Sequence, residues 1–476
     1  MARVDHDPQP CRRALLSGGA FWPIMSTGQR NDCLTDRSGH GSGMTRKNRM
    51  ERRDFQMIRN LLITTALAAT LGSGAHAQTK ADVLDTYADI AAAKYEDSLI
   101  AARALEDAVA ALIDAPSAET LQAARTAWLQ SRVPYQQTEV YRFGNPIVDD
   151  WEGRVNAWPL DEGLIDYVDG AYGGPTDANQ LAALNVIANP SFTLSGTRID
   201  ASEITPALLQ DTLHEVDGIE ANVATGYHAI EFLLWGQDLN GHDAGAGDRP
   251  WTDFAQGDAC TGGNCDRRAE YLAAATDLLV SDLEWMAAQW AEGGEARESV
   301  MADEQAGLSA ILTGMGSLSY GEQAGERMRL GLMLNDPEEE HDCFSDNTHN
   351  SHFYDGMGIR NVYLGEYVRT DGSLVSGPSL SDLVAADNPE LDAEMRQRLM
   401  ETMMALGRIK TAAEAGFAYD QMLERGNDAG EELVMGGVNA LIAQTRSIER
   451  VVSDLGLGGI EIEGSDSLDA PSAVFQ

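Results

Sequence analysis

Apolar residues recur every three or four positions along most of the chain after residue 80. The clearest stripe consists of Leu272, Ala275, Leu279, Leu283, Met286 and Trp290. The same rhythm runs through 391–406 and 434–455. This spacing places apolar side chains on one face of a helix, so each segment is predicted to be an amphipathic α-helix.

Two more amphipathic helices are predicted over about 80–113 and 117–142. Asp114-Ala-Pro-Ser117 breaks the pattern between them, and Ser117 is a plausible N-cap for the second helix. No set of evenly spaced alternating strands is visible. The pattern therefore predicts an all-α fold of packed helical bundles.

Three segments lack helical periodicity and are rich in Gly, Pro, Asp or aromatic residues: 144–176, 236–266 and 335–358. Long irregular segments in a helical protein are often functional. We expect the second to join two helical lobes, at about 78–255 and 265–460. The small, acidic residues of 461–476 are expected to form a disordered tail.

The amino-terminal part of the chain has the features of an export signal. Arg59 precedes the apolar run 61–71, which is too short for a membrane-spanning helix, and Ala75-His-Ala77 fits a cleavage site. We expect cleavage before Gln78. Residues 1–56 lack a core pattern and are expected to be a dispensable extension, so the mature protein is predicted to lie in the periplasm or cell envelope without a transmembrane segment.

Composition and cysteine usage agree with an exported protein. The 476-residue chain has a formal net charge of −41, which disfavours nucleic acid and anionic lipid as partners. Cys260 and Cys265 flank a short Gly-rich loop and are predicted to form a disulfide in an oxidising compartment, with metal binding by this pair as the alternative. Cys343 has no evident partner and is expected to be buried or half-buried.

His228 and Glu231 are the leading candidates for chemistry. They are three residues apart in an apolar segment that reads as helix, so they share one helical face. An imidazole and a carboxylate can both bind a metal ion, and an unpartnered carboxylate in apolar surroundings would be costly. A pair held only by hydrogen bonds is the alternative, because His-x-x-Glu also occurs by chance.

Gly226-x-His228-x-x-Glu231 resembles the signature of the imelysin family, bacterial envelope proteins classed as metallopeptidases and linked to iron uptake. Three other blocks support the resemblance and spread it over most of the chain after residue 80: 132–144, 158–167 and 325–329 followed by 338–349. The resemblance implies a metal ion, iron or zinc, and other envelope iron-uptake proteins as potential partners.

A metal ion would need further ligands from neighbouring helices. Glu139 and Asp161 rank first, because their aromatic surroundings imply burial, and Asp166 is a secondary candidate. Taken singly, each could equally be a cap or an ion-pair partner. Arg327 or Arg329 could neutralise a cluster of buried acids.

The block 338–349 is dense in potential ligands. His341 and Asp342 are secondary metal candidates, together with Asp346 and His349. The same side chains could instead hold a long loop through hydrogen bonds to the backbone.

Three functions are compatible with these residues. The leading one is metal binding in iron uptake, with His228 and Glu231 as ligands. The second is a metallopeptidase that uses Glu231 in catalysis, although the chain lacks the His-Glu-x-x-His motif of common zinc peptidases. The third is a helical binding module without a metal.

Overall fold

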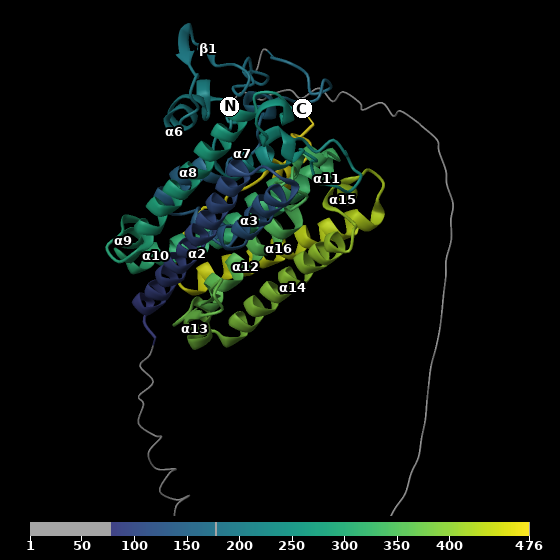
Figure 1. Cartoon of the computed structure of the whole chain (residues 1–476). Helices are drawn as coiled ribbons and strands as arrows, with labels where there is room; N and C mark the ends of the chain where they lie inside the picture. Colours follow the sequence, from purple (N-terminus) through teal and green to yellow (C-terminus); the bar gives the residue numbers. More distant parts are fainter. Residues whose placement is uncertain (1–77, 177–178, 476) are drawn as a thin grey trace, which may run out of the picture. The chain divides into compact units, whose positions relative to one another are not determined.

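The computed structural model describes residues 78–475 apart from 177 and 178 (Figure 1). The extension and signal peptide predicted for 1–77 lie outside the described residues. Helices dominate the described part of the chain, which confirms the predicted all-α class. The α-helices are α2 (Lys80–Asp114), α3 (Ala118–Gln136), α4 (Pro146–Asn156), α5 (Glu162–Ile165), α6 (Pro206–Leu208), α7 (Gly226–Trp235), α8 (Cys265–Trp290), α9 (Glu295–Met301), α10 (Glu304–Ser317), α11 (Leu330–Leu334), α12 (Thr348–Leu364), α13 (Leu380–Asp387), α14 (Pro389–Glu414), α15 (Tyr419–Leu423), α16 (Asp428–Asp454) and α17 (Asp466–Asp469).

Shorter elements connect these helices. Two π-helical segments are η2 (Leu209–Leu213) and η6 (Leu318–Arg329). The 3-10 turns are η1 (Glu139–Tyr141), η3 (Val216–Gly218), η4 (Trp251–Phe254), η5 (Gly257–Ala259) and η7 (Pro337–Glu339). Two antiparallel hairpins pair β1 (Ser191–Leu194) with β2 (Thr197–Asp200) and β3 (Glu366–Val368) with β4 (Leu374–Ser376).

The long helix α2 packs against both α3 and α8. Ser117 caps α3 by accepting a hydrogen bond from the backbone of Thr120, as the sequence predicted. Large aromatic side chains fill the space between these helices, and Tyr95 stacks on Trp290 with 6.3 Å between ring centroids. The apolar stripe of α8 is buried in this core, which accounts for its regular spacing.

A second set of helices lies beside the first, with α14 packed against both α12 and α16, and α16 against η6 (Figure 1). The largest hydrophobic cluster contains Leu84, which precedes the segment 236–266 in the sequence, and Leu312, which follows it. One cluster thus includes residues from both of the expected lobes. A division into two lobes at that segment stays a prediction. Among the described residues, no helix combines the length and apolar composition needed to cross a membrane.

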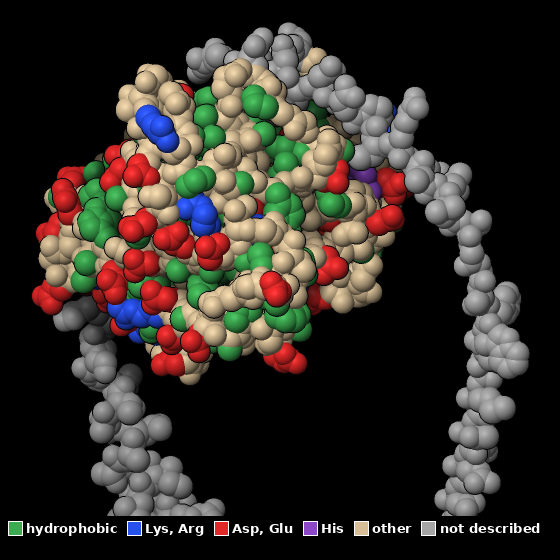
Figure 2. Space-filling model, turned by 45° about the horizontal axis from the view of Figure 1, so that its top comes forward, with side chains coloured by type: hydrophobic (Ala, Val, Ile, Leu, Met, Phe, Trp, Pro, Cys, Tyr) green, Lys and Arg blue, Asp and Glu red, His purple; other side chains and the backbone are tan. Residues whose placement is uncertain are grey.

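Acidic side chains are scattered over the face of the molecule drawn in Figure 2, and Lys and Arg side chains are sparse on that face. This distribution agrees with the formal net charge of −41 for the whole chain. A surface of this sign attracts cations and repels polyanions. That nucleic acid and anionic lipid are not partners stays a prediction.

The cysteines and the carboxyl-terminal segment were two further subjects of prediction. A disulfide joins Cys260 to Cys265, as predicted, and Cys343 is a buried free thiol. Residues 461–475, where we expected a disordered tail, pack along η6 in the structure. Arg329 Nε donates to the carbonyl of Ser467, and Ser467 Oγ donates to that of Gly325. These contacts join segments far apart in the chain, so local composition could not indicate them.

Candidate metal centre

Helix α7 carries His228 and Glu231 into the interior, where both side chains are fully buried. The helix begins at Gly226, whose φ of +81° lies in the left-handed region that favours glycine. A Cβ at this position would lie 2.4 Å from the carbonyl oxygen of Val155. The glycine of the Gly-x-His-x-x-Glu motif is therefore required by backbone conformation and by close packing.

The two motif side chains contact each other directly. Nδ1 of His228 lies 3.0 Å from Oε2 of Glu231. The other carboxylate oxygen, Oε1, accepts hydrogen bonds from the backbone nitrogen and the hydroxyl of Ser345, at 3.0 and 2.6 Å. Nε2 of His228 is buried and has no hydrogen-bond partner. Both oxygens of Glu231 thus have partners, while Nε2 of His228 has none.

His341 and Asp342 approach His228 from the loop between η7 and α12. One ligand atom from each of His228, His341 and Asp342 can be chosen so that all three lie within 4.8 Å of one another. The imidazole rings of the two histidines cross edge to face, with centroids 4.8 Å apart. The ring of Trp158 packs on His228 at 5.0 Å. The structure thus brings two imidazoles and one carboxylate to a single buried point.

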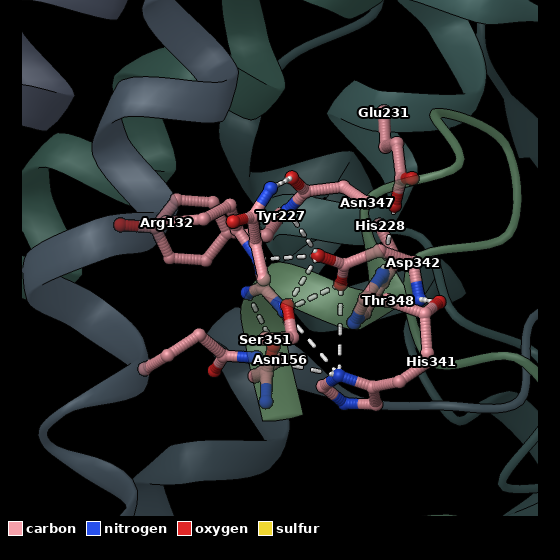
Figure 3. Close-up of polar contacts among 12 residues, drawn as sticks. Arg132, Asn156, Tyr227, His228, Glu231, His341, Asp342, Asn347, Thr348 and Ser351 are labelled. Atoms are coloured by element: carbon pink, nitrogen blue, oxygen red, sulfur yellow. Dashed lines mark hydrogen bonds and ion pairs between the residues drawn. The ribbon is translucent and has the colours of Figure 1, made fainter. Parts of the chain in front are cut away.

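Asp342 is held in place by a dense set of donors (Figure 3). Arg132 forms a fully buried ion pair with Oδ1 at 2.7 Å. Oδ2 accepts hydrogen bonds from Asn347 at 2.7 Å and Ser351 at 2.5 Å. Arg132 also donates to Asn156 at 2.6 Å. These bonds fix the carboxylate against His341 and supply its counter-charge.

Burial controls the protonation of the histidines. It lowers the pKa of His228 to about 3, and the positive charge of Arg132 acts in the same direction. Burial and the charge of Arg327 likewise hold the pKa of His341 well below its usual value. Both imidazoles are therefore neutral at physiological pH, which is the form that binds metal ions.

The pKa values of Glu231 and Asp342 shift in opposite directions. Burial, followed by the negative charge of Asp342, raises the pKa of Glu231 well above its usual value. Burial alone would also raise the pKa of Asp342, but the charge of Arg132 and the hydrogen bonds from Ser351 and Asn347 act together with His228 to lower that pKa. Asp342 is therefore an anion in this centre, whereas an ionised Glu231 would gain from a nearby cation.

Glu139, expected as a ligand, lies in a separate buried network. Its Oε2 accepts a hydrogen bond from Arg327 at 2.7 Å. Arg327 also pairs with Glu322 at 2.8 Å and Asp355 at 3.2 Å. Arg327 therefore neutralises a cluster of buried acids, as the sequence suggested. That cluster includes Glu139 and is separate from the group around His228.

Asp161 and Asp166 are also placed away from His228, among partners of their own. Asp161 is half-buried at the N-cap of α5 and accepts hydrogen bonds from Asn179 and Tyr172. Asp166 is fully buried between Arg249 and Arg268, at 2.7 and 2.6 Å. Asp166 matches the ion-pair alternative, whereas the side chain of Asp161 makes no capping hydrogen bond to α5.

Sequence reasoning missed two residues that shape the centre. Arg132 stands out in the sequence only as the start of a block, yet its guanidinium holds Asp342. Ser345 fixes Glu231 through its backbone and its hydroxyl. The one indication for both residues was that they lie inside the blocks 132–144 and 338–349. A single sequence does not show which residues of these blocks contact each other.

Comparisons with known proteins agree with the architecture. The family model described as Imelysin matches residues 91–448. Iron-regulated protein A of Synechococcus elongatus is 23% identical over 365 residues, covering 74% of this chain and 79% of that protein. A crystal structure of a protein described as an iron-regulated protein A precursor, from Parabacteroides distasonis, aligns with a TM-score of 0.57 at 19% identity. It covers 80% of this chain and 97% of that one, and it supports the fold alone.

Proposed function

The chain belongs to the imelysin family, and we propose that it is an exported protein that binds a metal ion, iron, through His228, His341 and Asp342. In this proposal Glu231 is not itself a ligand. It accepts the Nδ1 hydrogen of His228 and so directs Nε2 toward the metal. Carboxylates commonly orient metal-binding histidines in this way.

The observation that carries the proposal is the unpartnered Nε2 of His228. A buried polar atom without a hydrogen bond is costly, and most such atoms have a partner. One ring nitrogen of His228 also lies within 4.8 Å of a ligand atom of a second imidazole, His341, and of the carboxylate of Asp342. A bound cation would satisfy Nε2 and offset the charge of an ionised Glu231.

The donor set favours a transition metal. Two imidazoles and one carboxylate match the ligands of many non-haem iron sites, and zinc accepts the same donors. The name of the Synechococcus relative, iron-regulated protein A, favours iron. Three protein ligands leave positions for further ligands, so a resident ion and a transported one are both compatible with the centre.

Export is part of the same proposal. It rests on the apolar run and cleavage pattern before Gln78 and on the disulfide between Cys260 and Cys265. Amino-terminal sequencing of the protein from the periplasm should begin within a few residues of Gln78. Recovery of a periplasmic protein that retains Met1 would contradict cleavage.

We do not extend the proposal to peptide hydrolysis. Glu231, the candidate base, has both oxygens engaged by His228 and Ser345. Its side chain is fully buried, as is that of His228. A peptide would have to reach a region that is closed in this structure, so nothing in the geometry favours the peptidase.

The test is metal titration of the mature chain. Calorimetry with Fe(II) under anaerobic conditions, and with Zn(II) in parallel, should show one site that His228→Ala and His341→Ala each abolish. His242→Ala is the matched control, because His242 lies on a loop and bonds to the carbonyl of Asn335. Circular dichroism verifies folding. If both alanine variants fold and bind metal like the parent, the centre is only a hydrogen-bonded pair.

A further inference from the structure

A second group of acidic side chains lies beside the same loop. Asp238 follows α7, Asp346 precedes α12, and Asp420 belongs to α15. One oxygen from each of the three carboxylates lies within 4.8 Å of the others. Glu340 adds a fourth carboxyl group next to Asp420 and Asp346. Four segments of the chain thus bring oxygen donors together.

The buried members of this group have free oxygens. Glu340 is 1% exposed, and neither Oε1 nor Oε2 has a partner at hydrogen-bonding geometry, although Asp420 and Thr348 are close enough to influence its carboxyl group. Asp420 is also 1% exposed, with Oδ2 unpartnered. Oδ1 of Asp346 is buried without a partner, while its Oδ2 accepts from the backbone of Gly245 at 2.9 Å. Unsatisfied carboxylate oxygens of this kind require either protons or a cation.

No arginine or lysine of the described residues forms an ion pair with these four carboxylates, in contrast to three other buried acids. Asp342 has Arg132, Asp166 has Arg249, and Glu139 has Arg327. Removing a carboxylate from water without a counter-charge is strongly unfavourable. The side chains of this group therefore lie together without the arginine that accompanies each of those three acids.

We propose that Asp238, Glu340, Asp346 and Asp420 form a binding site for a hard divalent cation of the calcium class. Calcium takes roughly six to eight oxygen ligands in flexible arrangements, as carboxylates, carbonyls and water supply them. All four side chains here offer oxygen and none offers nitrogen or sulfur, which separates this site from the one around His228. Asp238 and Asp346 are half-buried, so the ion has access from solvent.

The position of this site gives it a structural role. Glu340 and Asp346 mark the two ends of the segment that also carries His341, Asp342 and Ser345. A cation bound at both ends of the segment fixes its course between η7 and α12. It thereby holds Ser345 on Glu231 and presents His341 and Asp342 to His228. The calcium site is chemically independent of the transition metal and does not require it.

The experiment is a calcium titration of the mature chain after removal of bound metals by a chelator. Calorimetry should show one site, and Asp420→Asn and Glu340→Gln should each weaken calcium binding at least about tenfold, since each removes a charged ligand. Asp107→Asn is the matched control, because Asp107 is exposed near Glu106 and Asp277, another acidic surface group. It should leave calcium binding unchanged.

Two comparisons keep the outcome unambiguous. His228→Ala should bind calcium like the parent, so a failure of the transition-metal proposal leaves this one intact. If the parent takes up no calcium, the buried carboxyl groups are neutralised by protons and the proposal is overturned. It is also overturned if Asp107→Asn weakens calcium binding as much as Asp420→Asn does. Should Asp420→Asn fail to fold, Glu340→Gln, which retains the shape of the side chain, gives the deciding titration.

Discussion

His228 and Glu231 form a hydrogen bond across one turn of α7, with 3.0 Å between Nδ1 of the imidazole and Oε2 of the carboxylate. The same carboxylate is held from the other side by Ser345, which belongs to the loop carrying His341 and Asp342. Glu231 therefore connects the helix to the loop. In the proposed centre, a carboxylate at this position orients the histidine through a hydrogen bond and is not itself a metal ligand.

Glu231→Gln should weaken metal binding without abolishing it. A glutamine amide cannot accept from His228 through one end while also accepting from Ser345 through the other, because its nitrogen only donates. Loss of such an orienting partner lowers metal affinity by about 10–100-fold. Titration with Zn(II) measures the change, and Glu284→Gln, an exposed substitution on α8, is the control. Complete loss of binding would make Glu231 a ligand instead.

Arg132→Gln should destabilise the protein strongly, because it leaves Asp342 buried without its counter-charge. Breaking one partner of a fully buried ion pair costs about 3–5 kcal/mol in the free energy of unfolding. The matched control is Arg103→Gln, which breaks an ion pair with Glu284 whose side chains are 53% and 52% exposed. That change should cost about 1 kcal/mol or less. Urea unfolding of both variants measures the difference, and equal costs would contradict the role assigned to Arg132.

The helical fold could be predicted because its evidence is local. The stripe of α8 and the cap at Ser117 each depend on residues within a few positions of one another. The spacing of His228 and Glu231 likewise determines their shared face without any knowledge of tertiary contacts. These local predictions agree with the structure, but the helix predicted over 117–142 was too long, since α3 ends at Gln136 and the 3-10 turn η1 follows.

The partners of His228 could not be ranked correctly from the sequence. Glu139 ranked first for its implied burial, and it is indeed 2% exposed. Burial alone does not indicate which charged group pairs with a carboxylate. The partner of Glu139 is Arg327, which is 188 residues away in the sequence. His341 and Asp342 ranked lower because their loop lacks periodicity. Their position depends on Arg132 and on the packing of α12, which only the tertiary structure shows.

Gly226→Ala should destabilise the protein because it strains the backbone at the first residue of α7. The backbone is left-handed there, and the new Cβ would meet the carbonyl of Val155 at 2.4 Å. A strained residue of this kind costs about 1–3 kcal/mol, and displacement of α7 would also disturb His228. Gly436→Ala is the control: it lies within α16, and a Cβ there would have no atom closer than 3.7 Å, so it should stabilise by about 0.4–1 kcal/mol. Thermal unfolding should therefore shift in opposite directions for the two variants.

His352→Phe should make the protein more resistant to acid. Both ring nitrogens of His352 are buried without partners, and its ring packs on Tyr419 at 5.1 Å, so a phenyl ring can replace it. Burial lowers the pKa of His352 to about 3, from 6.5 in the unfolded chain, and the charge of Arg327 adds to this. Between these values the unfolded state binds a proton that the folded state does not. Stability from this group is therefore full above about pH 6.5 and falls as the pH decreases.

At about pH 5 the histidine should cost the parent protein about 2 kcal/mol relative to about pH 8, and phenylalanine removes this cost. Carboxyl groups with raised pKa values act in the opposite sense, but they are present in both proteins and cancel in the comparison. Urea unfolding of parent and variant at these two pH values measures the difference. His242→Phe, on a partly exposed loop, is the control substitution. If the gain of His352→Phe is the same at both pH values, His352 does not titrate as a buried neutral imidazole.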